Sequence, residues 1–500
     1  MAEASLEKNS VSFTAKAAGA AKATGANYGD DDPIAAFATT PGGSALTLIR
    51  CSGKGSIELI NSIFTSLLNK KNNPVKKPLD EKLPGAAGNT IIHGWIISGG
   101  EKIDEVLVSV FRAPKSYTGE DSIDICCHGG ISAGKAVMAA LKDAGFRDAL
   151  PGEFTFRAFM NGKLDLTRCE SVMELVSAKT EKGRSRAVSR LSGSLEKEIN
   201  EIKNRLVQVL AAAEIYLDYS EDEISADNIE EIEGSLPGRE TAQDALARLK
   251  KLSASWQAER IFQEGLTLVI AGRPNAGKSS LFNLLLKEDR SIVTEIPGTT
   301  RDWIEAWISI NGIPVRLVDT AGLRETSDSV EKIGVNRSLN LLNEADLVLY
   351  LIDGESGITA EDLKYAGCCC LYVWNKSDIA LPPQPFPVKN IAPVCVSAKT
   401  GEGISGLYAA ITAAVERKAA CDFQTGNDGF VALGTERQKK LVDAACRALD
   451  EALAMSESKS PLDIIAPLLR EAVNSLGEIT GEVSTADILE EMFSRFCVGK

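Results

Sequence analysis

Histidine and long apolar runs are scarce in this sequence of 500 residues. His93 and His128 are the only histidines, which excludes a metal site built from several imidazoles. No uninterrupted apolar run approaches the roughly 18–20 residues that a transmembrane helix needs, so we expect no membrane span. Eleven cysteines are present, but no pair has C-x-x-C spacing. This disfavours a disulfide framework or a structural zinc site and favours a cytoplasmic location.

Acidic residues exceed basic ones, with 69 Asp plus Glu against 55 Lys plus Arg and a net charge of −14. Part of the excess is local, because residues 218–233 contain many carboxylates and no Lys or Arg. Residues 70–82 and 179–190 are locally basic, and we interpret both as solvated surfaces rather than RNA sites. The balance therefore disfavours a non-specific polyanion binder, whereas local, salt-sensitive contact with RNA remains compatible with it.

The order of predicted elements divides the chain into five segments. Residues 1–30, rich in Ala, Gly, Lys and Ser, are predicted to be a disordered extension. Residues 31–165 alternate short strands with turns and indicate an α+β domain. Residues 166–262 and 421–500 have helical periodicity, and between them residues 263–420 alternate strands with helices, as in an open parallel sheet. We therefore predict an α/β domain inserted into an α-helical domain; the alternative is two separate helical modules.

Hydrophobic spacing supports these assignments at particular positions. Residues 47–50, 90–95 and 106–111 form short apolar runs that predict strands. One helix face in the first helical segment is predicted from apolar residues at steps of three and four: Leu195, Ile199, Ile202, Leu206 and Val209.

A phosphate-binding loop lies between a predicted strand and a predicted helix. The strand at residues 266–271 leads into G-x-x-x-x-G-K-S, which starts at Gly272. In such a loop, backbone N–H groups surround phosphate oxygens at the positive end of a helix. Lys278 is placed to contact the β- and γ-phosphates, and the Ser279 hydroxyl is placed to ligate Mg²⁺.

Three further motifs follow predicted strands in the order expected of a GTPase. They are D-x-x-G at residues 319–322, N-K-x-D at 375–378 and S-A-K at 397–399. The Asp378 carboxylate can accept two hydrogen bonds from guanine, which adenine cannot offer. The sequence therefore predicts a domain that binds GTP. The candidate GTP-binding residues are Asn275, Ala276, Gly277, Lys278, Ser279, Ser280, Thr294, Glu295, Ile296, Pro297, Gly298, Thr299, Thr300, Asp319, Thr320, Ala321, Gly322, Asn375, Lys376, Asp378, Ser397, Ala398 and Lys399.

The residue that orients the attacking water is not evident from these motifs. Thr300 is the natural second hydroxyl on Mg²⁺, in a loop that the γ-phosphate orders. Ras-like enzymes place a Gln directly after D-x-x-G, but Leu323 stands there in this chain. Leucine cannot orient water, so another polar group must do so. The nearby candidates are Arg324, Glu325, Asp328 and Glu331.

The sequence resembles the MnmE (TrmE) family of tRNA uridine 5-carboxymethylaminomethyl modification GTPases over nearly the whole chain after about residue 31. Besides the GTP motifs, the resemblance lies in residues 113–121, 127–130, 151–155 and 161–166 and in the terminal Phe-Cys-Val-Gly-Lys of residues 496–500. It implies a P-loop Ras-like GTPase domain inserted into an α-helical domain and preceded by an α+β tetrahydrofolate-binding-like domain.

For the GTPase domain, the resemblance implies activation by potassium and by dimerisation of the domain. The family's K⁺ ligands correspond to Asn275, Thr294, Ile296 and Thr299, and its Mg²⁺ ligands to Ser279 and Thr300. A cation there supplies positive charge to the transition state. The family's catalytic acid corresponds to Glu331, which would act beside Lys278.

For the amino-terminal domain, the resemblance implies folate binding and formation of a homodimer. The cofactor would be a 5,10-methylene or 5-formyl tetrahydrofolate. The contacting positions are Arg50, Asp124, Lys163 and Lys500, with Asp124 in place of the usual Glu. Cys497 is either a small buried thiol or a residue with a chemical role.

The implied activity is addition of an aminomethyl or carboxymethylaminomethyl group to C5 of the wobble uridine (position 34) of certain tRNAs. It requires a heterotetramer with the FAD-dependent subunit MnmG (GidA). A flavin site in this chain is not indicated, because G-x-G-x-x-G at residues 401–406 follows the S-A-K motif and no strand with a ribose-binding acid comes after it.

Two alternatives remain at this stage. One is a regulatory GTPase of the ribosome-assembly type, which the terminal motif and the amino-terminal block disfavour. The other is a folate-dependent aminomethyl-transfer enzyme with a regulatory GTPase domain, in which this chain performs the carbon chemistry unaided.

Overall fold

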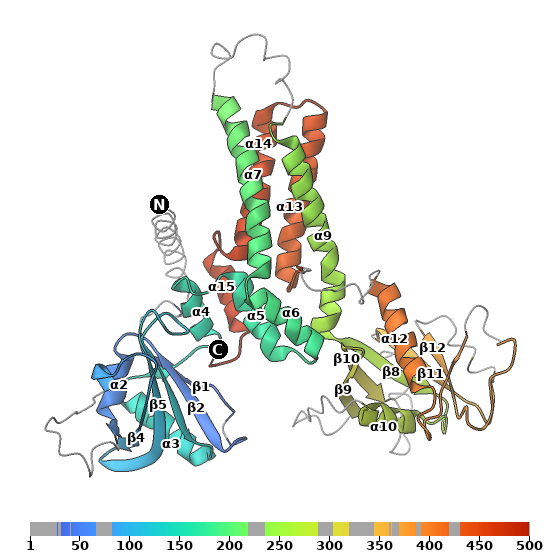
Figure 1. The fold of residues 1–500 in the computed structure, drawn as a ribbon, viewed down its shortest axis with the longest axis horizontal. Helices are drawn as coiled ribbons and strands as arrows, with labels where there is room; N and C mark the ends of the chain where they lie inside the picture. Colours follow the sequence, from blue (N-terminus) through green and yellow to red (C-terminus); the bar gives the residue numbers. More distant parts are fainter. Residues whose placement is uncertain are drawn as a thin grey trace, which may run out of the picture. The chain divides into compact units, whose positions relative to one another are not determined.

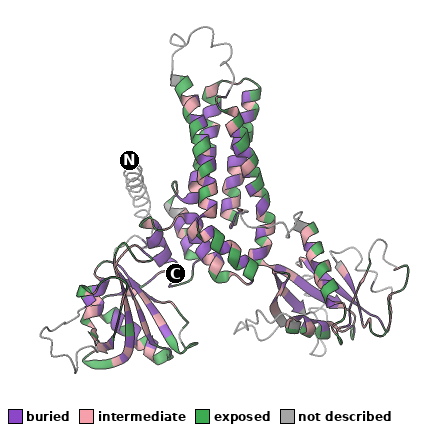
Figure 2. Ribbon diagram, in the orientation of Figure 1, coloured by how far each residue is buried: buried purple, intermediate pink, exposed green. Residues whose placement is uncertain are grey.

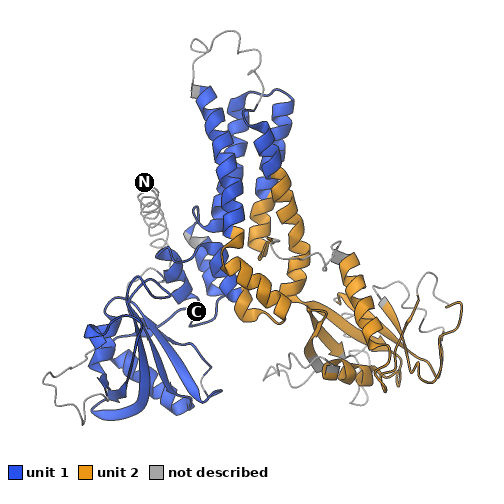
Figure 3. Cartoon of the chain, viewed as in Figure 1, with its two compact units in different colours: residues 1–173, 196–245, 444–500 blue, residues 174–195, 246–443 orange. Residues whose placement is uncertain are grey.

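The described part of the chain forms two β-sheets and a group of long α-helices (Figure 1). The computed structural model describes residue 28 and residues 32–40, 42–66, 83–218, 236–288, 304–319, 345–359, 362, 370–386, 392–419 and 431–499. These residues fall into two compact units (Figure 3). Unit 1 comprises residues 1–173, 196–245 and 444–500, and unit 2 comprises residues 174–195 and 246–443. The limits predicted at residues 165, 262 and 420 stay predictions.

Unit 1 contains a seven-stranded sheet in the order β3-β4-β5-β6-β2-β1-β7. Its strands pair antiparallel except for β1 with β7, which are parallel. This mixed pairing agrees with the predicted α+β class. The strands are β1 (Ile34–Phe37), β2 (Leu46–Ser52), β3 (Phe64–Ser66), β4 (Thr90–Ser98), β5 (Glu101–Phe111), β6 (Ser122–His128) and β7 (Arg147–Asp148).

Helices cover one face of this sheet. Alternate residues of β2, β4, β5 and β6 are buried against α2 (Ser56–Ser62) and α3 (Ile131–Asp143), because successive side chains of a strand point to opposite faces (Figure 2). The 3₁₀ turn η2 (Leu83–Gly85) adds the buried Leu83 to the same core. Helix α4 (Glu153–Met160) follows β7. The predicted strands at 47–50, 90–95 and 106–111 all lie within observed strands.

Long helices precede and follow the second sheet in sequence. Before it come α5 (Leu166–Ser177), α6 (Glu181–Leu191), α7 (Ser194–Asp218) and α9 (Arg239–Glu264); after it come α13 (Glu436–Glu457), α14 (Leu462–Thr480) and α15 (Ala486–Ser494). The five apolar residues predicted to share a face of α7 are all buried.

Contacts between the two helical segments confirm that the α/β domain interrupts a single helical domain. In unit 1, Arg239 of α9 pairs with Glu457 of α13. In unit 2, the Ser253 hydroxyl of α9 donates to Asp443 of α13 at 2.7 Å. Because helix α9 of the first segment pairs with helix α13 of the second segment in each unit, neither segment forms a separate module.

Unit 2 contains a six-stranded sheet in the order β13-β12-β11-β8-β10-β9. All neighbouring strands are parallel except β9 and β10, as expected when strands alternate with helices. Its elements are β8 (Leu266–Gly272), α10 (Lys278–Glu288), β9 (Ile304–Ile310), β10 (Ile313–Asp319), β11 (Leu347–Asp353), β12 (Cys370–Asn375), β13 (Val394–Cys395) and α12 (Ile404–Ala419).

The central strands of this sheet are buried on both faces. All seven residues of β11 are buried, as is typical of a parallel sheet with apolar layers on both sides. One layer includes Leu281 of α10 and Leu407 of α12, and the other includes Tyr350 and Trp374. The sheet therefore holds the carboxyl ends of β8, β11 and β12 at fixed positions.

An aromatic core in unit 1 corrects the assignment of one residue. Tyr28 falls within the extension predicted to be disordered, yet it is buried, and its hydroxyl donates to Pro151 O at 2.9 Å. Its ring centroid lies 5.3 Å from that of Phe156. Phe493 and Phe496 belong to the same core. Tyr28 is therefore buried by residues that lie far away in the sequence, which its own low-complexity segment could not indicate.

Candidate functional site

The loop after β8 turns sharply at three residues with positive φ. The φ angles are 142° at Gly272, 64° at Asn275 and 92° at Gly277. Glycine accepts such angles without steric cost, and Asn is one of the few other residues that tolerates them. A side chain at Gly277 would also meet the Asn375 amide at 2.2 Å. The glycines of the motif are therefore required by the backbone path, and α10 begins directly after it at Lys278.

Lys278 is held against the start of this loop. Its Nζ atom donates to Gly272 O at 3.0 Å and to Arg273 O at 2.8 Å. Ser279 and Ser280 are exposed in the first turn of α10. The loop thus presents an ammonium group, two hydroxyls and the positive end of a helix, a combination suited to a phosphate group.

Asn375 brings three of the predicted motifs together. Its Nδ2 atom donates to Ala276 O at 2.8 Å, and its Oδ1 atom accepts from Ala398 N at 3.0 Å. Asn375 is 2% exposed. This amide therefore joins the phosphate loop, the end of β12 and the S-A-K segment after β13, although β8, which leads into the phosphate loop, is separated from β12 by β11.

Lys376 is positioned by the end of β11. Its Nζ atom lies 2.9 Å from Asp353 Oδ2 and 3.2 Å from Glu355 Oε2. Hydrogen bonding to Asp353 and then to Glu355 raises the pKa of Lys376. Burial opposes ionisation of Asp353, but hydrogen bonds from Lys376 and the Glu355 N–H lower the pKa of its carboxyl group overall. The lysine stem therefore lies fixed beside the exposed Asp378.

The S-A-K segment forms a closed turn before α12. Ser397 N donates to Glu402 O at 2.9 Å, and Gly401 N donates to Ser397 O at 2.9 Å. A side chain at Gly403 would meet Cys395 O at 2.0 Å. Gly401 and Gly403 of the G-x-G-x-x-G pattern thus serve this turn, and both have positive φ. Lys399, the last residue of the motif, lies in the same turn.

Asp319 is the last residue of β10. Several other predicted residues lie outside the described part of the chain. They are Thr294, Glu295, Ile296, Pro297, Gly298, Thr299, Thr300, Thr320, Ala321, Gly322, Glu331 and Lys500.

A second group of predicted residues meets in unit 1. Arg50 of β2 is directly opposite Asp124 of β6, and Arg50 Nε lies 3.2 Å from Asp124 Oδ1. The guanidinium carbon of Arg50 is 5.5 Å from the Tyr117 ring centroid. Lys163 Nζ donates to Pro114 O at 2.9 Å. Arg50 and Lys163 therefore both contact the loop between β5 and β6.

The carboxyl-terminal residues lie against the same domain. A side chain at Gly499 would meet Phe37 O of β1 at 2.5 Å, and Phe37 pairs with Ile49, the neighbour of Arg50. Gly152 N donates to Cys497 O at 3.4 Å. The Cys497 residue itself is exposed, so the interpretation of this cysteine as a small buried thiol is wrong.

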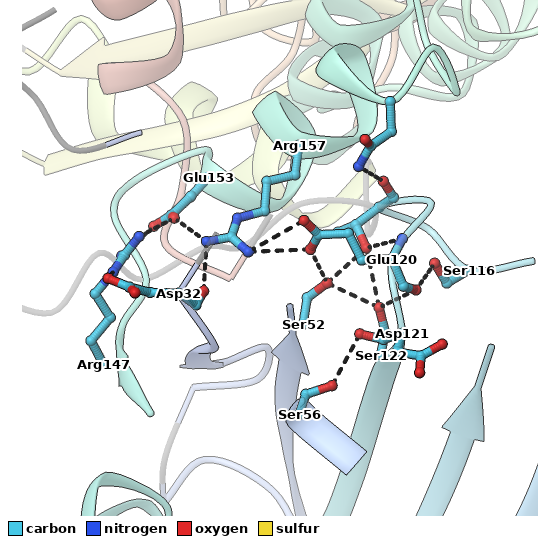
Figure 4. A network of polar contacts seen from close by, with 12 residues as sticks. Asp32, Ser52, Ser56, Ser116, Glu120, Asp121, Ser122, Arg147, Glu153 and Arg157 are labelled. Atoms are coloured by element: carbon cyan, nitrogen blue, oxygen red, sulfur yellow. Dashed lines mark hydrogen bonds and ion pairs between the residues drawn. The ribbon is translucent and has the colours of Figure 1, made fainter. Parts of the chain in front are cut away.

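A buried ion-pair network joins two motifs whose roles the sequence did not reveal (Figure 4). Glu153 of the 151–155 motif is fully buried between Arg147 and Arg157, with N–O distances of 2.6 and 2.9 Å. Arg157 Nη1 also lies 3.2 Å from Glu120 Oε2, in the 113–121 motif. Ser52 of β2 donates to the same carboxylate at 2.8 Å. The network ties α4 to β2 and to the loop that contacts Arg50.

Replacing Glu153 with alanine should destabilise unit 1 strongly. Two guanidinium groups would lose a fully buried partner, and breaking a buried pair in this way costs about 3–5 kcal/mol. We expect a lower midpoint of chemical denaturation, followed by circular dichroism. Glu491→Ala, which removes an exposed pair with Arg495, is the matched control and should change little. Equal midpoints for the two variants would contradict the structural role of Glu153.

The basic run at residues 179–190 is only in part the solvated surface that the sequence suggested. Lys182 and Arg184 are exposed, but other cations of the run are used in contacts within the protein. Arg190 is 3% exposed and lies 2.6 Å from Glu174 and 2.8 Å from the fully buried Glu259. Lys179 Nζ lies 3.0 Å from the Trp307 ring centroid. Arg190 and Lys179 therefore make contacts within unit 2, because the packing of its elements places two carboxylates and an aromatic ring opposite them. The other basic run, at residues 70–82, lies outside the described residues.

Comparison with known proteins covers almost the whole chain. A family model described as the MnmE helical domain matches residues 166–497, and one described as the GTP-binding protein TrmE N-terminus matches residues 33–163. Among relatives named tRNA modification GTPase MnmE, the Treponema denticola protein is 44% identical over 497 residues, covering 95% of this chain and 99% of its own. The Carboxydothermus hydrogenoformans protein is 39% identical, covering 94% and 100%.

Solved structures are similar to part of the chain. The FeoB G-domain from Methanococcus jannaschii covers 30% of this chain and 98% of its own, with 25% identity and a TM-score of 0.23.

In the described residues, no helix is both long enough and apolar enough to cross a membrane.

Proposed function

The chain belongs to the MnmE family of tRNA modification GTPases, and from this premise we propose that it is a potassium-activated GTPase that modifies the wobble uridine of certain tRNAs. It would add an aminomethyl or carboxymethylaminomethyl group at C5, together with an FAD-dependent MnmG-type subunit and a one-carbon tetrahydrofolate. The observation that most strongly supports the GTPase part of this proposal is Asn375, which joins the phosphate loop, the N-K-x-D turn and the S-A-K turn. The family match outside the GTPase motifs disfavours a ribosome-assembly GTPase.

The phosphate loop suits a nucleotide with Mg²⁺ and K⁺. Lys278 would bind the β- and γ-phosphates, and Ser279 with Thr300 would hold Mg²⁺, which neutralises charge that develops on the phosphates. Asn275 is in the left-handed region, with φ of 64°, so its side chain leaves the loop at an angle that few residues adopt. With Thr294, Ile296 and Thr299 it would hold K⁺, which supplies further positive charge. Glu331 would orient the attacking water.

GTP hydrolysis should be at least about tenfold faster in KCl than in NaCl of equal ionic strength. One missing electrostatic contact to a phosphoryl transition state commonly costs more than this. Initial rates of phosphate release from the full-length protein measure the effect, and Asn275→Ala should remove the difference between the salts. Equal wild-type rates in KCl and NaCl would count against the potassium site.

The Arg50–Asp124 region suits the anionic folate. Arg50 lies beside a carboxylate and two aromatic rings, Tyr117 at 5.5 Å and Phe154 at 6.0 Å from its guanidinium carbon, and its side chain is 22% exposed. With Lys163 and Lys500 it would bind the negatively charged glutamate tail. Asp124 would accept a hydrogen bond, from a shorter side chain than the family's usual Glu. When bound, the folate supplies the one-carbon unit.

Arg50→Ala should weaken binding of 5-formyltetrahydrofolate by about tenfold or more, because a hydrogen bond to a charged group contributes roughly 1.5–3 kcal/mol. Isothermal titration calorimetry of the full-length protein measures the affinity. Lys54→Ala, at an exposed lysine next to β2, is the matched control. Unchanged affinity in Arg50→Ala would remove Arg50 from the folate site.

The assembly would be a homodimer that joins two MnmG-type subunits and acts on tRNA in the cytoplasm. Because the chain is acidic overall, and Arg190 of the described basic run is used in internal ion pairs, its contact with tRNA would be local and shared with the partner.

A further inference from the structure

The second residue of the phosphate loop, Arg273, is held by the segment that follows β11. Its Nε atom lies 3.0 Å from Asp362 Oδ1, and its Nη2 atom donates to Gly357 O at 2.5 Å. Ser356 Oγ lies 3.4 Å from Nη2. Strands β8 and β11 are parallel neighbours, so the loop and this segment leave the sheet at the same edge. One guanidinium group therefore links the two.

The carboxylate that receives Arg273 is buried and fully hydrogen-bonded. Asp362 is 1% exposed. Its Oδ1 atom also accepts from the Tyr350 hydroxyl at 3.0 Å, and its Oδ2 atom accepts from Thr359 N at 2.7 Å and Thr359 Oγ1 at 2.9 Å. A charge this deep is stable only with a well-placed partner, and the Tyr350 and Thr359 donors hold the carboxylate in one orientation. Arg273 thus meets a rigid anchor.

The backbone of Arg273 is in turn a contact of Lys278. The Lys278 ammonium donates to the carbonyl groups of Gly272 and Arg273. If the Arg273 side chain is fixed, its carbonyl is fixed too, and with it the direction of the ammonium. A misplacement of about 1 Å in a group that binds the reacting phosphates can lower a rate roughly a hundredfold.

We propose that Arg273 and Asp362 are positioning residues for GTP hydrolysis, which act by fixing the carbonyl groups that orient Lys278. This rests on the phosphate-binding role proposed for Lys278. The pair lies outside the glycines, lysine and serine of the motif, and Asp362 is 89 positions away from Arg273 in the sequence. The same segment begins at Asp353, which holds Lys376, so it also connects the phosphate side of the site with the base side.

The test is the single-turnover rate of GTP hydrolysis per occupied site, measured with the full-length protein in KCl. Occupancy is determined separately by stoichiometric titration with a fluorescent GDP analogue. Asp362→Asn should lower the rate per site by about tenfold, which corresponds to 1.36 kcal/mol in the barrier. Arg273→Lys should give an intermediate rate, because lysine can reach the carboxylate but cannot also form the forked contact to Gly357. The double variant should be no slower than the slower single variant.

Two further variants separate positioning from folding. Tyr350→Phe removes one donor to Asp362 and leaves the ion pair, so it should fold and show a smaller loss of rate per site; it replaces Asp362→Asn if that protein does not fold. Arg260→Ala removes an exposed pair with Glu264 in α9 and should retain the wild-type rate. A purely structural pair would lower the number of occupied sites and leave the rate per site unchanged, which would overturn the proposal.

Lys278→Ala distinguishes failure of this proposal from failure of the assignment beneath it. If Lys278→Ala hydrolyses GTP normally, Lys278 has no phosphate role and both proposals fall. If Lys278→Ala is inactive while the Arg273 and Asp362 variants turn over normally at each occupied site, only the positioning proposal is overturned. The positioning proposal is supported if Lys278→Ala is inactive and the rate per occupied site falls in Asp362→Asn, with an intermediate rate in Arg273→Lys.

Discussion

Replacing Glu331 with alanine should lower the rate of GTP hydrolysis by about 10²–10⁴-fold while the affinity for GTP stays close to that of the wild type. Positioned proton-transfer groups contribute a factor of this size. Leu323 stands where Ras-like enzymes place a water-orienting Gln, so this chain needs another polar group for the task. Because Glu331 would act on the water and not on the nucleotide, its loss should change turnover and not binding.

The measurement combines single-turnover hydrolysis with equilibrium binding of a non-hydrolysable GTP analogue. Glu325→Ala is the matched control, since it removes a nearby carboxylate of the same stretch of sequence and should keep the wild-type rate. Wild-type turnover in Glu331→Ala would refute the assignment, and equal losses in both variants would point to a general effect of substitutions in this stretch of sequence.

Replacing Asp378 with asparagine should lower the affinity for GTP by about 10³-fold or more. The carboxylate accepts two hydrogen bonds from guanine, and a site that leaves such polar groups unpaired discriminates strongly. The asparagine amide offers a donor in place of one acceptor, which suits xanthine, whose 2-position carries an oxygen. The turn should survive the change, because Ile379 N donates to Lys376 O at 2.9 Å and Asn375 anchors the strand end.

Competition binding with GTP and xanthosine triphosphate measures this exchange of preference. Ser377→Ala, in the same turn, should keep the preference for GTP. If Asp378→Asn binds GTP as tightly as the wild type, this carboxylate does not read the base. If it binds neither nucleotide, the change has disrupted the site, and the assignment of Asp378 as a selectivity residue loses its support.

The fold of the GTPase domain was largely predictable because its signals are local. Apolar runs such as residues 266–271 indicate buried strands, and the helical patterns between them require parallel pairing. The same reasoning predicted the buried face of α7. Local patterns were insufficient for Tyr28, whose burial depends on Phe156 and Phe493. They also misled at Arg190, which reads as part of a basic surface and is paired internally.

The residues that carry the proposed chemistry were similarly accessible from sequence, since spacing after a strand places a side chain at a known edge of the sheet. Asp353 was missed, although it ends β11 as Asp319 ends β10; comparing strand ends would have found it. Arg273 and Asp362 gave no such signal. In unit 1, the motifs at 113–121 and 151–155 were visible as a resemblance, but their connection through Glu153 and Arg157 was not.

By itself, then, the sequence determined the order of the motifs, the parallel sheet that carries them and the family. Those properties follow from periodicity and from spacing along a single element. Only the tertiary structure decided which charges meet: Arg273 with Asp362 across 89 positions, and Arg157 with Glu120 across 37. Such pairs depend on the path of the whole chain, because each is stable only where packing excludes water and brings the two partners within hydrogen-bond distance.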